Sequence, residues 1–177
     1  HSHAPMRLYS FRQKVAAIEA AGIKNLFVVR FDERFASLSA DQFVSHVLYE
    51  CLQAKHVVTG YNFHFGKNRQ GDTDFLAHKA RELNFGFIAH PEVMTSAGEA
   101  ISSSRIRALL SEGKIEDACA MLGRPYAIDG RVTRGKQRGK NMGFPTINLS
   151  LARRFKPRFG VYAGRVRLSK DKKPYDA

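Results

Sequence analysis

The chain has 177 residues, which suffices for one large domain or two small ones. Hydrophobic residues make up 44% and charged residues 25%, the composition of a soluble globular protein able to build a core. The formal net charge of +13, from 29 basic and 16 acidic residues, predicts a surface that attracts anions such as nucleotides, acidic lipids or nucleic acid.

The sequence also bears on the cellular compartment. No apolar run approaches the roughly 20 residues of a membrane span and no signal-peptide pattern is present, so we expect no membrane association. Cys51 and Cys119 fall inside predicted helices without metal-ligand spacing, and we interpret them as buried, reduced thiols. These features predict a cytoplasmic protein.

Helix and strand patterns alternate over the first two thirds of the chain. Short continuous apolar runs are typical of strands covered on both faces, and apolar residues at helical spacing are typical of packed helices. The predicted strands are "NLFVVRF" (25–31), "HVVTG" (56–60) and "GFIAH" (86–90), and the predicted helices span 9–23, 39–54, 72–85, 102–113 and 114–123.

Residue types at the helix ends mark their limits. Ser39 and Gln42 have the spacing of a capping box, and Asp72 or Thr73 is predicted to cap the following helix. Glycine readily takes the left-handed conformation that ends a helix. The predicted stop residues are Gly22, Gly113 and Gly123.

Alternating strands and helices at this spacing predict an α/β fold with a parallel sheet. In such sheets ligands bind beyond the carboxyl ends of the strands. Two segments leave those ends, "GYNFHFGKNRQGD" (60–72) and "SAGEAISSSRIR" (96–107), and both are candidate binding segments.

The pattern changes after Gly123 to short segments rich in β-branched and aromatic residues, separated by Gly, Pro and basic turns. This pattern predicts an antiparallel β-domain, a barrel or sandwich, with its boundary between Gly123 and Pro125. Roughly 50 residues are too few for a comfortable closed barrel, so we expect the chain to stop inside this domain.

Three serines precede a predicted helix in "ISSSRIRALL" (101–110), and its first turn carries Arg105 and Arg107. A helix N-terminus offers unpaired N–H groups and a partial positive charge, so it suits a phosphate. Hydroxyl and guanidinium groups add further donors. The equally weighted alternative is that one serine only caps the helix and the arginines are solvated.

The loop 60–72 alternates aromatic and polar residues. Phe63 and Phe65 could stack on a flat ring beside the amide of Asn62 and the cations of Lys67 and Arg69, a set that suits a nucleotide or flavin. The alternative is an ordered loop whose aromatic residues plug the edge of the sheet.

The basic, glycine-rich segment "RGKQRGKNMGFPTINLS" (134–150) departs from a Walker loop. The interval from Gly135 to Gly139 is one residue short, and an asparagine stands where the magnesium-binding hydroxyl belongs. A strand after it would place Thr146 and Asn148 on one face, where their oxygen atoms could serve Mg²⁺. On spacing alone, a solvent-facing Thr–Asn pair is the simpler interpretation.

Six segments together resemble the prokaryotic bifunctional riboflavin kinase/FAD synthetase family in order and spacing, from about Pro5 to the end of the chain. The resemblance implies a Rossmann-like nucleotidyltransferase module, residues 1–123, that adenylylates FMN. It also implies a riboflavin kinase module, residues 124–177, that is part of an antiparallel β-barrel. The segments are "FDERFASLSADQF", "VTGYNFHFGKNRQGD", "ISSSRIRALL", "LGRPYAIDGRV", "GFPTINL" and "FGVYAGRV".

The resemblance also implies roles for single residues. "ISSSRIR" is similar to the family's I-S-S-T-x-x-R element, which engages the ATP phosphates, and "GYNFHFG" is similar to its G-x-[DN]-F-x-F-G loop. "GFPTINL" is similar to the kinase signature P-T-A-N. The implied ligands are Ser103, Ser104 and Arg107 for ATP phosphates in the adenylyltransferase; Asn62, Phe63, Phe65 and Arg69 on the FMN and adenine side; Gly135, Gly139, Gly143, Thr146 and Asn148 for ATP in the kinase; and Thr146 and Asn148 for the metal.

Substrates and partners follow from the same resemblance. It implies Mg²⁺ and ATP, with riboflavin, FMN and FAD as substrates or products. We expect small-molecule nucleotides and flavins as partners, neither nucleic acid nor a membrane, and the sequence leaves a homo-oligomer open. The family's H-x-G-H loop has no counterpart here and its catalytic glutamate lies beyond residue 177. The resemblance therefore implies an internal fragment without assigned catalytic residues, not fully active alone.

Two other functions are open on the residues alone. A basic nucleic-acid-binding protein with an OB-like barrel would use the segment 131–140. Against it, we expect the positive charge to be spread along both halves, and the aromatic residues interleave poorly with the basic run. An adenylyltransferase with a different acceptor would have no need of the FPT-x-N segment.

Overall fold

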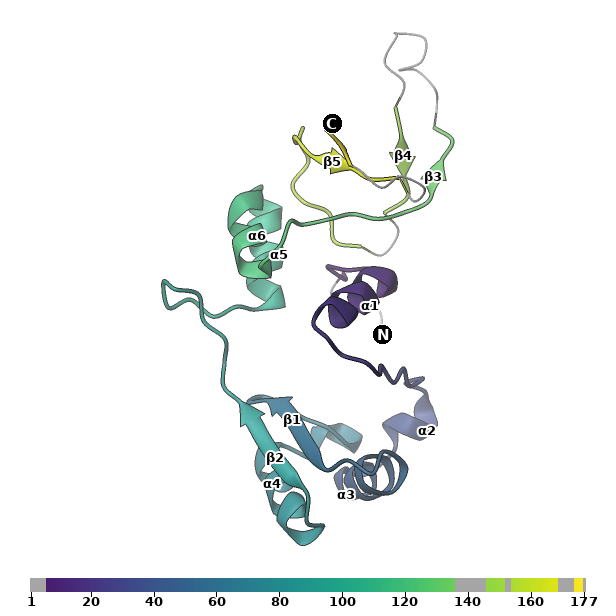
Figure 1. Ribbon diagram of the computed structural model, residues 1–177, viewed down its shortest axis with the longest axis vertical. Helices are drawn as coiled ribbons and strands as arrows, with labels where there is room; N and C mark the ends of the chain where they lie inside the picture. Colours follow the sequence, from purple (N-terminus) through teal and green to yellow (C-terminus); the bar gives the residue numbers. More distant parts are fainter. Residues whose placement is uncertain (1–5, 136–145, 152–153, 169–173, 177) are drawn as a thin grey trace. The chain divides into compact units, whose positions relative to one another are not determined.

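The computed structural model describes residues 6–135, 146–151, 154–168 and 174–176. The chain divides into two compact units, one spanning residues 25–100 and the other combining residues 1–24 with 101–177 (Figure 1). Each unit has a hydrophobic core of its own. A mixed α/β chain with a parallel sheet and small antiparallel sheets confirms the coarse fold prediction.

A parallel pair of strands lies at the centre of the 25–100 unit. β1 (His56–Gly60) and β2 (Gly86–His90) lie side by side, in a register that runs from His56 opposite Gly86 to Gly60 opposite His90 (Figure 1). α4 (Thr73–Glu82) connects them and packs against β2. Both strand ranges and the parallel direction were predicted and are confirmed.

Capping residues set the helix starts in this unit as predicted. The backbone N–H of Gln42 donates to Ser39 Oγ at 3.1 Å, and that of Ser39 donates to Gln42 Oε1 at 2.9 Å. Asp72 accepts a hydrogen bond of 2.9 Å from the backbone N–H of Phe75. The other helices of the unit are α2 (Glu33–Ala36), α3 (Ala40–Gln42), the π-helix η1 (Phe43–Cys51) that continues α3, and the 3₁₀ turn η2 (Lys67–Arg69).

Only one face of the two-stranded sheet is covered. Val57 and Phe87 pack against the core of this unit, in which Leu76 is fully buried. On the other face Val58 is 63% exposed and Ile88 57%. The prediction that these strands are covered on both faces is therefore wrong for the described residues. Alternate side chains of a strand point to opposite faces, and this unit's helices pack on one of them.

The strand predicted at 25–31 is also wrong, because that segment makes no strand pairing among the described residues. Phe27, Val28 and Phe31 are exposed. A strand forms only where a partner strand takes its backbone hydrogen bonds, and an apolar run carries no information about the partner. The segment is an irregular, exposed connection.

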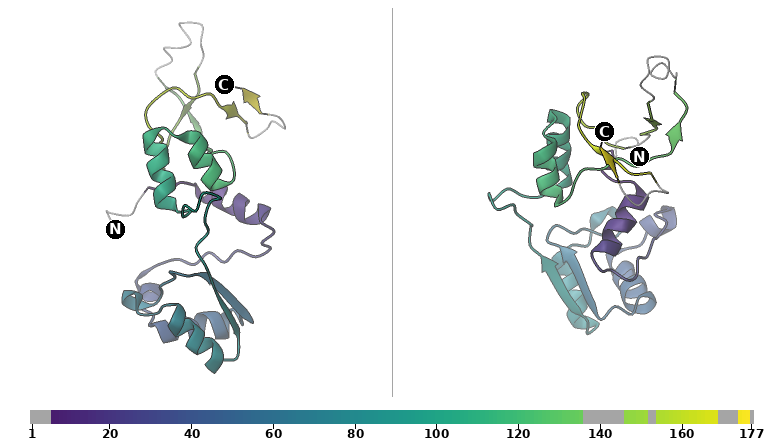
Figure 2. Two further views of the ribbon diagram at one scale, coloured as in Figure 1. Left: turned by 90° about the vertical axis from the view of Figure 1, so that its left-hand side faces the viewer. Right: turned by 45° about the horizontal axis from the view of Figure 1, so that its top comes forward.

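The second unit is built on a pair of helices that lie side by side in Figures 1 and 2. Leu109, Leu110 and Ala118 of this pair are buried together with Leu8 from the N-terminal segment. No helix formed by the described residues is long and apolar enough to cross a membrane. The helices are α1 (Phe11–Ala20), α5 (Ser103–Glu112) and α6 (Ile115–Leu122), and the predicted stop residues Gly22, Gly113 and Gly123 have φ of 82°, 83° and 65°.

Short antiparallel strands follow Gly123, which confirms the predicted change of pattern. They form two separate ladders within the described residues, and the closed barrel stays a prediction. The boundary between residues 123 and 124 also stays a prediction. The pairs are β3 (Val132–Thr133) with β4 (Asn148–Leu149), and β5 (Arg165–Val166) with β6 (Tyr175–Asp176).

The charge distribution corrects one argument against nucleic-acid binding. Residues 1–123 carry 14 basic and 13 acidic residues, a net charge of +1, whereas residues 124–177 carry 15 basic and 3 acidic residues, a net charge of +12. The positive charge is therefore concentrated after the predicted boundary and is not spread along both halves.

The two cysteines differ in their surroundings. Cys51 is exposed at the end of η1, so the prediction of a buried thiol is wrong there. Cys119 is partly buried, and its Sγ accepts a hydrogen bond of 3.1 Å from the backbone N–H of Tyr126. Both thiols are free.

Candidate functional site

A hydrogen-bonded pair lies where β1 and β2 end. The backbone N–H of Tyr61 donates to His90 O, and the Tyr61 hydroxyl donates to Glu92 Oε1, both at 2.9 Å. The bond to Glu92 is the largest cause of a raised Tyr61 pKa, since a phenolate would face a carboxylate. Sequence reasoning missed this pair, although Tyr61 and Glu92 each follow a predicted strand at the edge where ligands bind.

The loop after β1 is closed on itself and fixed to the helix before it. Phe65 and Gly71 exchange two backbone hydrogen bonds of 3.0 Å, and the N–H of Lys67 donates to Leu38 O at 2.7 Å. Gly66 has φ of 73°, and a Cβ there would lie 2.6 Å from the backbone nitrogen of Ala40. Glycine is required at this contact for both reasons.

The aromatic side chains of this loop belong to the core. Phe65 is only 7% exposed, and its ring centroid lies 5.3 Å from that of Phe63 in a stacked arrangement. Phe43 of η1 and Phe75 of α4 contact Phe65 from outside the loop. These contacts match the alternative in which the aromatic residues plug the sheet edge. The predicted polar residues of the loop, Asn62 and Arg69, are both exposed.

A hollow in the same unit lies away from this loop. Its lining comes from the end of η1 and from the residues just before β1 and β2, so it opens at the amino ends of the strands. Ligands of parallel sheets bind at the opposite, carboxyl ends. The lining residues are Tyr49, Glu50, Gln53, Ala54, Lys55, Asn84 and Phe85.

The N-terminus of α5 presents two exposed serines. Ser102 caps the helix by accepting a hydrogen bond of 3.2 Å from the backbone N–H of Arg105. Ser103 and Ser104 form the first two helical positions, and both are exposed. The first turn has no acidic residue, so the partial positive charge of the helix end is not neutralised locally.

Arg107, one turn further along α5, is partly buried and positioned by the chain. Its Nε donates a hydrogen bond of 2.9 Å to the backbone oxygen of Met6. Within the described residues, that bond leaves the terminal nitrogens of the guanidinium to other partners. A guanidinium held at Nε can present its two terminal nitrogens, as a pair of parallel donors, to a phosphate.

The kinase-type segment brings two predicted residues together. Asn148, in β4, pairs with Thr133 of β3, and a Cβ on Gly135 would collide with the Asn148 side-chain amide. Thr146 is exposed and precedes the strand, so its predicted shared face with Asn148 stays a prediction. Gly139 and Gly143 lie outside the described residues.

The donors available for a metal are neutral oxygens. The described residues contain no group of three or more His, Cys, Asp or Glu side chains arranged to bind a metal. The Thr146 hydroxyl and the Asn148 amide oxygen are hard ligands of the kind that Mg²⁺ takes alongside substrate phosphates and water. These two residues fit the ion only as part of such a shared shell.

The predicted residues fall into both units. Ser103, Ser104 and Arg107 belong with Thr146 and Asn148 to the unit of residues 1–24 and 101–177, whereas the loop with Asn62 and Arg69 belongs to the 25–100 unit. Sequence reasoning thus located exposed donors in three separate segments.

Two family models match the chain one after the other. The model described as FAD synthetase matches residues 1–105. The model described as riboflavin kinase matches residues 122–177.

Curated relatives match over nearly the whole chain. Proteins named bifunctional riboflavin kinase/FMN adenylyltransferase from Escherichia coli K12 and Haemophilus influenzae are each 38% identical, over 92% and 94% of this chain. The one from Pseudomonas fluorescens is 38% identical over 90%. The chain covers 52%, 54% and 50% of those proteins, about half of their length.

A solved structure has the same fold over most of the chain. It is described as a macrolide-efflux protein from Streptococcus pneumoniae and aligns with a TM-score of 0.79 at 29% identity. The alignment covers 96% of this chain and 53% of that one. The FAD synthetase model alone matches more than half of the residues, and the sequence relatives agree with it: this chain belongs to the FAD synthetase family.

Proposed function

We propose that the chain is part of a bifunctional transferase of FAD synthesis, which phosphorylates riboflavin to FMN and adenylylates FMN to FAD with release of pyrophosphate. The observation that carries this proposal is the tandem match of an FAD synthetase model and a riboflavin kinase model. The named relatives combine the two activities in one protein.

The proposed organisation is a nucleotidyltransferase module over residues 1–123 and a riboflavin kinase module over residues 124–177. The limits of the two family matches, 105 and 122, support this division. β1 and β2 belong to a larger Rossmann-like sheet, and the short strands after Gly123 belong to a β-barrel. The exposed apolar side chains of Val58 and Ile88 support a further layer over this face, because parallel sheets are ordinarily covered on both faces.

For adenylyl transfer, the N-terminus of α5 holds the ATP phosphates. Ser103 and Ser104 offer hydroxyl and backbone N–H donors, and Arg107 offers the end of its guanidinium. In this step the FMN phosphate attacks the α-phosphorus of ATP, and negative charge moves onto the departing pyrophosphate. Fixed donors that face this charge lower the barrier because they need not reorganise during the reaction.

The loop after β1 serves the flavin and adenine side of that reaction. Asn62 and Arg69 are its exposed polar groups. The contacts of Phe63 and Phe65 support a structural role for those two rings, which pack into the core and thereby fix the conformation of the loop. This assignment replaces stacking on a flat ring for Phe63 and Phe65.

For the kinase step, Thr146 and Asn148 contribute oxygen ligands to Mg²⁺ and the ATP phosphates. We also assign Gly135, Gly139 and Gly143 to ATP binding in this step, because a glycine has no Cβ to stand between backbone and ligand. Mg²⁺, when bound, neutralises charge on the transferred phosphoryl group. The close approach of Gly135 to Asn148 supports a shared site.

An assay that resolves FMN from FAD tests the proposal. In the gene product that contains this chain, Arg107→Ala is expected to lower FAD formation at least about a hundredfold while FMN formation persists. Arg12→Ala, an exposed arginine of α1, is the matched control and should leave both products unchanged. Equal loss of both products in the Arg107 variant would contradict two separate sites.

Nucleic-acid binding is the second candidate function, because positive charge is concentrated in residues 124–177. The comparisons do not support it, so it is tested directly by the salt dependence of binding. Small nucleotides neutralise few charges, so ATP binding should weaken only mildly between about 50 and 200 mM salt. Tight oligonucleotide binding with a steep salt dependence, in a protein that binds neither ATP nor flavin, would replace the proposed function.

A further inference from the structure

Two helices of this chain start with the same capping box but use it differently. In α3, Ser39 and Gln42 bond each other's backbones. In α1, Ser10 and Gln13 do the same, with distances of 2.9 and 3.1 Å. Only at α1, among the described residues, do the capping side chains also bond to a distant part of the chain.

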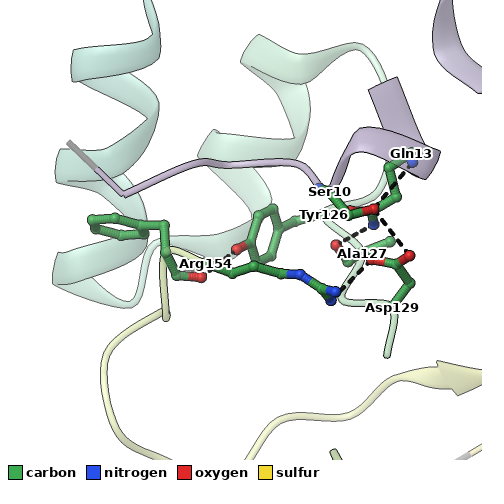
Figure 3. A network of polar contacts seen from close by, with 7 residues as sticks. Ser10, Gln13, Tyr126, Ala127, Asp129 and Arg154 are labelled. Atoms are coloured by element: carbon green, nitrogen blue, oxygen red, sulfur yellow. Dashed lines mark hydrogen bonds and ion pairs between the residues drawn. The ribbon is translucent and has the colours of Figure 1, made fainter. Parts of the chain in front are cut away.

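That distant part follows the proposed module boundary, and Figure 3 shows its contacts with Ser10 and Gln13. Ser10 Oγ donates to Asp129 Oδ2 at 2.9 Å, and Gln13 Nε2 donates to the backbone oxygen of Ala127 at 2.7 Å. The donors lie in the segment matched by the FAD synthetase model, and the acceptors lie in the segment matched by the riboflavin kinase model.

Asp129 also meets a cation from a third segment. Arg154 Nη1 lies 2.9 Å from Asp129 Oδ1, and both atoms are shielded from solvent. Their geometry is that of an ion pair without the alignment of a hydrogen bond. A half-buried carboxylate with two partners is costly to neutralise or remove, because each partner would lose its own contact.

Backbone and apolar contacts extend the same interface. The N–H of Phe155 donates to Arg7 O at 2.9 Å across the interface. Within the kinase-matched segment, the Tyr126 hydroxyl donates to Phe155 O at 2.8 Å and so holds Phe155 in place. Leu8 is buried in the core that α5 and α6 form, and Phe155 packs against this core. Residues 7–13 thus contact the kinase-matched segment by polar, backbone and apolar groups at once.

We propose that residues 7–13 are a docking segment that fastens the riboflavin kinase-matched part of the chain to the FAD synthetase-matched part, with Asp129 as its anchor. Asp129 lies three residues before β3, and Thr133 of β3 pairs with Asn148. The docking segment therefore positions the strand pair that carries the kinase residue Asn148. This last step rests on the proposed function, whereas the docking itself does not.

The two capping boxes supply a matched pair of variants for the test. Gln13→Glu keeps the oxygen that accepts from Ser10 N–H but replaces the donor to Ala127 by a carboxylate. Gln42→Glu makes the same change in a box without a distant contact. Amide hydrogen exchange of the 177-residue chain reports on Phe155 and on β3 and β4.

We expect Gln13→Glu to speed exchange at Phe155, β3 and β4 about tenfold, the size of a lost hydrogen bond that leaves a carbonyl unpaired. Gln42→Glu should leave those amides unchanged. Equal effects of the two variants, or none, would overturn the docking. If Gln13→Glu does not fold, Asp129→Asn, which keeps the side-chain shape, must speed exchange at the same amides.

Kinase kinetics test the positioning step separately. In the gene product that contains this chain, Asp129→Asn should raise the KM for ATP about tenfold with little change in kcat. An unchanged KM beside faster exchange would overturn the positioning of Asn148 but support the docking. A wild-type protein that forms no FMN would refute the proposed function, and the exchange experiment would still decide the docking.

Discussion

The two units of this chain differ in the contacts that hold each of them together internally. Residues 25–100 are contiguous, carry nine acidic and seven basic residues, and pack aromatic and aliphatic side chains around β1, β2 and α4. The other unit collects residues 1–24 and 101–177, carries 22 basic and seven acidic residues, and joins distant segments by polar contacts. The first unit is thus built by packing within one contiguous segment, whereas the second adds specific polar contacts between distant segments to its apolar core.

Truncation of one core leucine in each unit tests whether the units unfold separately. Leu76 and Leu110 are both fully buried, and replacement by alanine costs about 2–5 kcal/mol at such sites. Leu76→Ala should speed amide exchange in β1 and β2. Leu110→Ala should speed exchange in α5, α6 and at Arg158, whose N–H donates to Leu110 O.

The comparison of the two units fails if the Leu110 variant speeds exchange in β1 and β2 as strongly as in α5. That result would indicate one cooperative unit. Each variant serves as the control for the other, because the substitution and the initial burial are the same.

Two glycines of the 25–100 unit test how tightly its loop after β1 is built. Gly66 and Gly98 have similar positive φ values, 73° and 77°, but a Cβ on Gly66 would meet Ala40, while Gly98 has open space around it. Gly98→Ala should cost about 1–2 kcal/mol from backbone strain. Gly66→Ala should cost roughly 1–3 kcal/mol more, because the clash forces the backbone to shift.

Urea denaturation of the two variants measures this difference in the free energy of unfolding. The same cost for both glycines would show that the contact between Gly66 and Ala40 is not a packing constraint. In that case the loop after β1 would be less fixed than its hydrogen bonds indicate.

The sequence predicted features that depend on near neighbours. Caps at Ser39 and Asp72, the stop at Gly113 and the parallel strands before and after α4 follow from patterns of a few residues. The strand prediction at 25–31 was wrong because strand formation depends on a pairing partner, which the apolar run does not reveal. Asp129 was missed because its partners lie 119 residues earlier and 25 residues later in the chain.

In the candidate site, too, the sequence predicted features that depend on near neighbours and missed those that depend on distant contacts. The helix-start pattern predicted hydroxyl donors among the three serines, and the resemblance to the family selected Ser103 and Ser104, which are exposed. The bond from Arg107 to Met6 spans 101 residues, so only the fold reveals what positions that guanidinium. The burial of Phe65 likewise required the fold, because an alternating aromatic pattern suits a ligand and a core equally.

The smallest expected effect concerns Tyr61 and Glu92 at the carboxyl edge of the sheet. The bond to Glu92 raises the pKa of Tyr61 above its ordinary value of 10.0, so the hydrogen-bonded, protonated form is favoured in the folded state. The bond therefore contributes fully below about pH 10 and is lost as the pH rises through the raised pKa of Tyr61.

Glu92→Gln should lower the pKa of Tyr61 toward 10.0, because the phenolate would no longer face a carboxylate. NMR titration of ¹³C-labelled tyrosine measures this pKa, and Tyr61→Phe identifies the resonance. Glu82→Gln, which removes a carboxylate of the same unit bonded to Lys79, is the control and should leave the Tyr61 titration unchanged. An unaltered Tyr61 titration in the Glu92 variant would show that the pair does not persist in solution. The carboxyl ends of β1 and β2 would then no longer be joined by a side-chain bond between the segments that follow them.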